Sequence, residues 1–147
     1  MLRIRVRAVI IKDDKVLLIH RKKPGYEYHV FPGGAVEEGE SLKNALIREV
    51  EEETSLDIKI VKLLYKDIDE FGQDQSFYLC EYISGQPKLR ENSPEAEDML
   101  KNRLILYEPY WSNLQELPKL LLYPLKIRDW LLEDIKNNFE TSTHGVY

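Results

Sequence analysis

The sequence has little of what several classes of protein require. Cys80 is its single cysteine, so neither an intrachain disulfide nor a multi-cysteine zinc site can form. It follows the strand-like run 77–79, which predicts a small buried side chain. No apolar run is long enough to cross a bilayer, and the charges within MLRIRVRAVIIKDD are unlike the apolar centre of a signal peptide. We therefore expect a cytoplasmic protein without a membrane segment.

The charge balance limits the partners. A net charge of −5 leaves no basic excess for binding a nucleic-acid backbone, so we expect no polymeric nucleic acid. A small phosphorylated ligand remains compatible, because a metal ion can invert the local charge. With 147 residues, 43% of them hydrophobic, the chain can bury the core of one domain. We assign that domain to residues 1–139 and a flexible tail to residues 140–147.

Apolar periodicity and breaker residues predict a mixed sheet with two helices, an α/β (α+β) sandwich. The expected strands are residues 3–11, 15–20, 58–66, 75–83, 104–107 and 110–114. Residues 21–30 read as a loop with a short strand into Phe31, and residues 88–103 as a loop with a short helical turn. A last helix is expected to begin near Pro124.

The other helix is predicted from Ser41, a good N-cap, to about Thr54. Its buried stripe is Leu42, Ala45, Leu46 and Val50.

The same helix carries a cluster of carboxylates. Glu49, Glu52 and Glu53 stand at i, i+3 and i+4 and share one face, whereas Glu51 points elsewhere. Each like-charged pair at this spacing costs roughly 0.2–0.5 kcal/mol. Oxygen-rich clusters bind Mg²⁺ or Mn²⁺, which would offset this repulsion. The alternative is a solvated acidic face.

The residues around this cluster resemble the Nudix box. The matching positions are Gly34, Glu40, Arg48, Glu49, Val50, Glu52, Glu53 and Leu56. One position departs, because Ser55 stands where the family has glycine, and Phe31-Pro32-Gly33 is similar to the family's usual lead-in. The resemblance implies a Nudix-type α/β/α sandwich with a mixed central sheet and the box on a loop-helix-loop.

The resemblance also implies roles for individual residues. Glu52 and Glu53 correspond to the principal metal ligands, and Glu49 to a third ligand or to the base that acts on water. The backbone carbonyl of Gly33 is similar in place to one that reaches the metal in relatives. The implied cofactor is Mg²⁺, with Mn²⁺ as an alternative.

Two further box residues correspond to supporting groups. Arg48 and Glu40 resemble the pair that ties the helix to the preceding loop and orients the carboxylates. Ser55 would cost on the order of 1 kcal/mol if it keeps the left-handed geometry of the glycine. We therefore expect a slightly rearranged helix end without loss of activity.

The general base is open between two candidates. One is Glu49, and the other lies in the segment ENSPEAEDM, where relatives place a further acidic residue. We choose Glu95 there over Glu91, Glu97 and Asp98, because it follows a Ser-Pro turn. A solvated loop carboxylate is the alternative.

Substrate contacts are expected from residues beside the box. Arg21 could bind phosphate through its guanidinium fork, with a solvated surface position as the alternative. Tyr28, near Tyr26 and His29, could stack on a base or ribose, and hairpin packing is the alternative. Trp111 could line the pocket, although an aromatic residue in a strand commonly packs in the core.

The resemblance implies a metal-dependent pyrophosphohydrolase that cleaves a nucleoside diphosphate linked to another moiety. We favour a nucleoside triphosphate, including oxidised ones such as 8-oxo-dGTP, because the chain adds little to the catalytic domain. ADP-ribose or a nucleotide sugar comes second, and dinucleoside polyphosphates third. A nucleotide-sensing module without turnover is the alternative of another class. The expected partner is a small nucleotide, on a monomer or homodimer.

Overall fold

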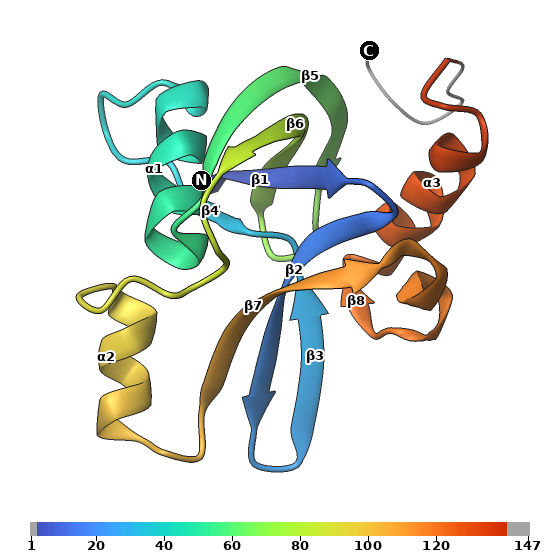
Figure 1. Cartoon of the computed structure of the whole chain (residues 1–147). Helices are drawn as coiled ribbons and strands as arrows, with labels where there is room; N and C mark the ends of the chain where they lie inside the picture. The colour runs from blue at the N-terminus through green and yellow to red at the C-terminus, as the bar shows by residue number, and fades with distance from the viewer. Residues whose placement is uncertain (1–2, 141–147) are drawn as a thin grey trace.

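The computed structural model describes residues 3–140, in which one mixed sheet lies between helices (Figure 1). The strands are β1 (Arg3–Lys12), β2 (Lys15–Lys23), β3 (Tyr26–Val30), β4 (Gly33–Ala35), β5 (Asp57–Ile68), β6 (Gln73–Ser84), β7 (Leu106–Asn113) and β8 (Leu122–Tyr123). The helices are α1 (Leu42–Thr54), α2 (Pro94–Lys101), the 3-10 helix η1 (Leu114–Lys119) and α3 (Leu125–Lys136). The predicted α/β sandwich is therefore confirmed, with a third α-helix that was expected only as a turn.

The main path of the sheet runs β5-β6-β1-β2-β3-β8. β1 pairs with β6 in parallel, as does β3 with β8, and the other pairs are antiparallel. One core layer packs Ala45, Leu46 and Val50 of α1 against the sheet. A second layer packs Ile127 and Leu131 of α3 against the other side.

The expected loop at residues 21–30 is wrong. β2 continues to Lys23 and forms a second hairpin with β3, with Pro24 and Gly25 at the turn. Gly25 supplies the positive φ of 72° that this turn needs. The basic residues after Ile19 give no apolar alternation that would predict a strand, because this part of the hairpin extends beyond the core.

β4 pairs with β1 where β1 and β2 diverge. The two long strands pair directly only at Ile11–Val16 and Lys12–Lys15, and β4 pairs with β1 from Arg5 to Arg7. Gly33 has φ 146°, and a Cβ there would lie 2.0 Å from the carbonyl oxygen of Val6. Only glycine fits so close to β1, and this approach places the residues after it beneath α1.

α1 has the bounds that its sequence predicts. The Ser41 hydroxyl accepts a hydrogen bond from the Asn44 amide, and Ala45, Leu46 and Val50 are buried, with Leu42 half-buried. The expected rearrangement at its end does not occur. Ser55 keeps the left-handed geometry with φ 62°, its amide donates to the carbonyl of Glu51, and its hydroxyl donates to the carbonyl of Lys88. These bonds offset the strain.

The segment after β6 is more ordered than expected. Ser93 caps α2 by accepting from the Ala96 amide, and Pro94 occupies the first turn, where a missing N–H costs nothing. β7 is one strand and not two short ones, since it passes through Pro109 opposite Ile19. Among the described strands β7 pairs with β2 alone, so its other edge tolerates proline.

Cys80 is buried as predicted, and burial raises the pKa of its thiol to about 12. No helix within residues 3–140 is long and apolar enough to span a membrane. Apart from Glu140, the predicted tail lies outside the described residues.

Candidate active site

The three glutamates of α1 lie at the edge of the core. Glu53 is 2% exposed, and the side chains of Glu49 and Glu52 are 14% and 18% exposed. Glu51 points to solvent with 63% of its side chain exposed. The structure therefore separates the shared face from Glu51, as the helical spacing predicts.

Gly34 makes room for one of these carboxylates. A Cβ at Gly34 would lie 2.6 Å from the carboxyl carbon and from Oε2 of Glu49. The backbone of β4 thus forms a cradle in which the Glu49 carboxylate rests. Any side chain at this position would displace it.

We expect Gly34→Ala to lower Mg²⁺ affinity by about tenfold or more, because Glu49 would be pushed out of its cradle. The measurement is a Mg²⁺ titration followed by thermal unfolding and by turnover. Gly25→Ala is the control, since nothing lies within 4 Å of its Cβ although its φ is +72°. Equal Mg²⁺ affinity in wild type and Gly34→Ala would contradict this role.

Arg48 connects α1 to the loop before it. Its Nε and Nη2 donate to the two oxygens of Glu40 at 2.8 and 2.9 Å, and Nη2 also donates to the carbonyl of Ala35 at 3.1 Å. Hydrogen bonds from Arg48 lower the pKa of Glu40 to about 2, and the same pair raises the pKa of Arg48. The structure thus brings together the pair that the resemblance implied.

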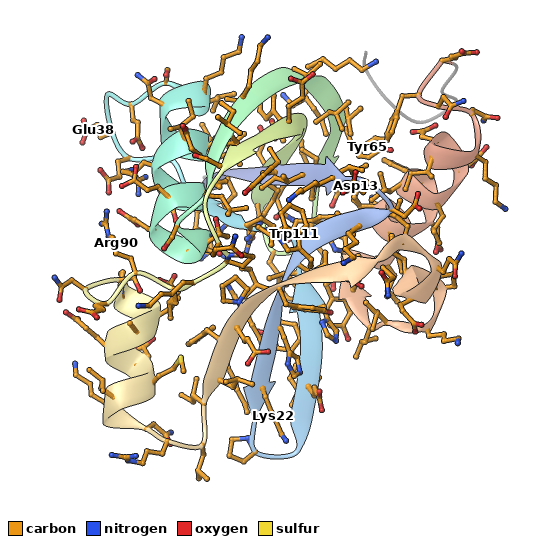
Figure 2. The ribbon with its side chains drawn as sticks, in the orientation of Figure 1. Asp13, Lys22, Glu38, Tyr65, Arg90 and Trp111 are labelled. Atoms are coloured by element: carbon orange, nitrogen blue, oxygen red, sulfur yellow. The ribbon has the colours of Figure 1, made fainter. Side chains whose placement is uncertain are left out.

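Arg48 also neutralises two of the clustered carboxylates. Its Nη1 lies 3.0 Å from Oε1 of Glu49 and 3.5 Å from Oε2 of Glu52. Arg90 lies at the junction of α1 and α2, with its Nη2 3.5 Å from Oε1 of Glu52 (Figure 2). As they stand, no three His, Cys, Asp or Glu side chains within residues 3–140 are grouped to hold an ion.

Glu53 is the carboxylate best suited to bind a cation. Its Oε2 is buried and has no hydrogen-bond partner among the described residues. Burial raises the pKa of Glu53 to about 8, opposed by the charges of Arg7 and Arg21 and reinforced by Glu95 and Glu49. Burial likewise raises the pKa of Glu49. A divalent cation would supply the positive charge that this oxygen lacks.

Glu95 joins this group from α2. Its charge raises the pKa of both Glu53 and Glu49, which places it in the same electrostatic environment. Its Oε2 is also buried without a hydrogen-bond partner in the part of the chain that the structure describes. The predicted base candidates Glu49 and Glu95 therefore lie within reach of one another's charge.

The carbonyl of Gly33, which the resemblance implies reaches the metal, has a hydrogen-bond partner on β1. This carbonyl accepts a hydrogen bond at 3.3 Å from Nη1 of Arg7, a residue that the sequence analysis missed. Nη1 also donates to the carbonyl of Phe31 at 3.2 Å, and Nε donates to Oε1 of Gln75 at 3.2 Å. The sequence does place three arginines at alternate positions of β1, but this pattern is also typical of the exposed face of a strand and did not indicate a functional role for Arg7.

The predicted substrate residues lie on the hairpin of β2 and β3. Arg21 and Tyr28 are cross-strand partners, and the Arg21 guanidinium lies 5.3 Å from the centre of the Tyr107 ring. Tyr28 packs against Tyr26 and Tyr123, with ring centres 4.9 and 5.8 Å apart. Arg21 is near Glu53, whose pKa its charge lowers, while Tyr28 belongs to an aromatic group.

Trp111 lies elsewhere. Its ring packs edge-on against Tyr82, with ring centres 5.6 Å apart, beside the core layer of α1. Packing and not pocket lining is therefore the role that the structure gives it.

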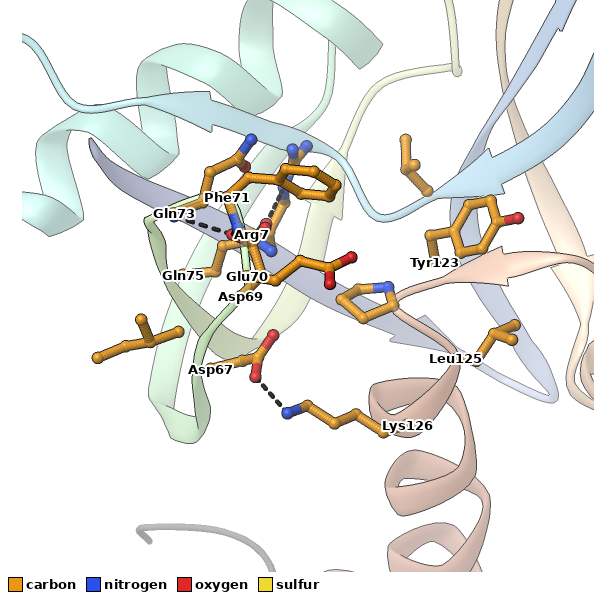
Figure 3. Close-up of a pocket in the computed structure, with 13 residues that line it drawn as sticks. Arg7, Asp67, Asp69, Glu70, Phe71, Gln73, Gln75, Tyr123, Leu125 and Lys126 are labelled. Atoms are coloured by element: carbon orange, nitrogen blue, oxygen red, sulfur yellow. Dashed lines mark hydrogen bonds and ion pairs between the residues drawn. The ribbon is translucent and has the colours of Figure 1, made fainter. Parts of the chain in front are cut away.

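A cavity of about 650 Å³ opens next to Arg7 (Figure 3). Its walls come from the tip of the β5–β6 hairpin and from the start of α3, and Tyr123 and Gln75 also contribute. Asp67 and Lys126 form an ion pair at 2.5 Å across it. Phe71 is 71% exposed at its rim. Such a volume is typical of small-molecule sites.

A family model described as the NUDIX domain matches residues 1–131. An ADP-ribose pyrophosphatase of Methanocaldococcus jannaschii is 36% identical over 107 residues, which cover 69% of this chain and 63% of that protein. The NAD-capped RNA hydrolase NudC of Escherichia coli is 29% identical over 128 residues, covering 86% of this chain and 45% of NudC.

The chain thus spans less than two thirds of the length of these curated relatives. Among solved structures, a Nudix hydrolase from Nitrosomonas europaea superposes with a TM-score of 0.68 at 25% identity, covering 94% of this chain and 90% of that one. The matched model, the relatives and the fold agree with the box at residues 34–56. This chain belongs to the Nudix hydrolase family.

Proposed function

We propose that this chain is a magnesium-dependent pyrophosphohydrolase that cleaves a nucleoside diphosphate linked to a second moiety. The observation that carries the proposal is the Glu53 carboxylate, which is buried with an unpartnered oxygen beside Glu49 and Glu95. A structural core would have no use for such a group, since burying an unpaired charge is costly. A cation site next to a diphosphate gives it a use.

Each residue of the site has a distinct proposed role. Glu49, Glu52 and Glu53 would hold Mg²⁺ or Mn²⁺, while Arg48 and Glu40 fix the position of the helix that carries them. A bound divalent cation neutralises charge that develops on phosphoryl oxygens. Glu49 or Glu95 then accepts the proton of the attacking water.

Glu49 suits that task because burial favours its protonated form. Glu95 is a candidate for another reason, because its buried Oε2 has no hydrogen-bond partner in the described chain and is free to accept a proton. For Glu49, the raised pKa helps because a base holds a transferred proton better when its pKa lies closer to the working pH. Glu95 belongs to α2, so a second element brings a carboxylate to the group on α1.

For the substrate we place ADP-ribose first, ahead of the nucleoside triphosphates that the sequence favoured. The 36% identical relative carries the name ADP-ribose pyrophosphatase. The cavity beside Arg7 has the volume for a nucleoside or ribosyl group. Phe71 at its rim and Tyr123 in its wall are available for stacking.

The test is a product assay with purified protein and Mg²⁺. The panel contains ADP-ribose, a nucleotide sugar, dGTP, 8-oxo-dGTP and a dinucleoside tetraphosphate, resolved by anion-exchange chromatography. We expect one compound to be strongly preferred and its turnover to stop on adding EDTA. Tight binding of one compound without turnover of any would overturn the enzyme and indicate a nucleotide-sensing module.

A further inference from the structure

Arg7 lies between the two halves of the proposed site. It lines the 650 Å³ cavity, and among the charges that act on it Glu53 contributes most. Its hydrogen bonds use Nε and both hydrogens of Nη1, on Gln75, Phe31 and Gly33. Within residues 3–140 nothing accepts from Nη2. The guanidinium is thus held by three hydrogen bonds, with Nη2 free to donate.

Two further arginines converge on Arg7. Arg5 precedes it by two positions and shares its face of β1, and Arg21 comes from β2. Both charges lower the pKa of Arg7, in addition to the larger effect of burial, so the three guanidinium groups repel one another. Nε of Arg5 and Nε of Arg21 are buried, and neither has a hydrogen-bond partner in the described chain.

Unpartnered, mutually repelling guanidinium groups call for an anion with several oxygens. A diphosphate matches this chemistry, because the free Nη2 of Arg7 and the unpartnered Nε atoms of Arg5 and Arg21 can each donate to a phosphate oxygen. The position is also suitable, since a substrate that reaches from the cavity to the carboxylates of α1 passes Arg7. We propose that Arg7, flanked by Arg5 and Arg21, binds the diphosphate of the substrate. This inference rests on the proposed function, because the diphosphate that the arginines bind contains the bond that the proposed enzyme cleaves.

A purely structural role for Arg7 is the competing explanation. Its bonds to the carbonyls of Phe31 and Gly33 hold the turn that leads into β4. Arg21 makes no such bonds, and its ring contact is with Tyr107. Comparison of variants at both positions therefore separates anion binding from support of the backbone.

The experiment is calorimetric titration of inorganic pyrophosphate and of ADP into the protein, in EDTA and at low ionic strength. We expect saturable binding of both, with Kd raised about tenfold or more by Arg7→Met and several-fold by Arg21→Met. Arg7→Lys should be intermediate, because a lysine keeps the charge and loses the hydrogen bonds that hold the guanidinium in place. Arg103→Met is the matched control, since Arg103 is exposed, does not line the cavity beside Arg7 and does not belong to the arginine cluster of Arg5, Arg7 and Arg21. Its Kd should equal that of wild type.

Thermal unfolding of each variant accompanies the titrations. If Arg7→Met does not fold, Arg7→Lys and Arg21→Met carry the test. Unchanged Kd in both, or no saturable binding by wild type, would overturn the proposal. With Mg²⁺ and substrate, we expect the arginine variants to raise KM more than they lower kcat. Anion binding without turnover of any nucleotide would refute the proposed enzymatic function and support the arginine site. Turnover with an unchanged KM in the arginine variants would support the enzymatic function and refute the arginine site.

Discussion

Glu53→Gln should lower kcat/KM of the Mg²⁺-loaded protein by about a thousandfold or more, and Glu52→Gln should come close. Both changes remove a charge from the proposed cation site while keeping the size of the side chain. The loss corresponds to about 4 kcal/mol of transition-state stabilisation, within the range of a metal ion acting on phosphoryl oxygens. The measurement is steady-state hydrolysis of the preferred nucleotide, with Mg²⁺ affinity determined in parallel.

Glu51→Gln is the matched control, because Glu51 lies on the same helix and is exposed. Its turnover should equal that of wild type. Glu95→Gln distinguishes a base from a ligand: a base lowers kcat and leaves Mg²⁺ affinity unchanged, whereas a ligand changes both. Full activity in both Glu52→Gln and Glu53→Gln would rule out the proposed metal site.

The metal-free protein should lose stability as the pH rises from about 4.5 to about 8. The pKa of Glu53 is raised from 4.5 to about 8 in the folded protein, because the carboxyl is buried. The folded state therefore holds a proton that the unfolded state releases, and its stability falls with increasing pH across this interval. At about 1.36 kcal/mol for each pKa unit, the full loss is on the order of 5 kcal/mol.

Urea unfolding at pH 5 and pH 8 in EDTA measures this effect. At pH 8, Glu53→Gln should be several kcal/mol more stable than wild type, since it buries no charge. At pH 5 the two proteins should differ little, and adding Mg²⁺ at pH 8 should favour wild type. Parallel pH profiles for wild type and Glu53→Gln would show that Glu53 does not titrate in this range. Glu40 has the opposite effect, because its pKa is lowered from 4.5 to about 2 in the folded protein. Its contribution to stability is present above about pH 4.5 and is lost as the pH falls toward 2.

Local signals made α1 predictable from the sequence. Ser41, the spacing of Ala45, Leu46 and Val50, and the glutamates at i, i+3 and i+4 all act within a few turns of one helix. The link between Arg48 and Glu40 followed from the resemblance, and it spans only eight positions. Features set by neighbours along the chain could be predicted for this reason.

Features set by distant partners could not. Arg7 reads as an exposed strand residue until β6 and β4 supply Gln75 and the carbonyl of Gly33. The cavity joins the tip of the β5–β6 hairpin to the start of α3, so no single segment encodes it. The second hairpin was missed because residues 21–28 project beyond the core, where apolar alternation is weak.

The parallel pairing of β1 with β6 sets an order of assembly during synthesis. The Arg7–Gln75 hydrogen bond joins residues 68 positions apart, and β6 is made only after α1 and β5. β1 therefore cannot pair with β6 until the residues between them have been made, and closing that long loop costs entropy before the pairing forms. We expect α1 to be helical early, and the cradle and the arginine cluster to form in the last docking step. A chain truncated before Gln73 should accordingly carry the complete Nudix box and bind no nucleotide.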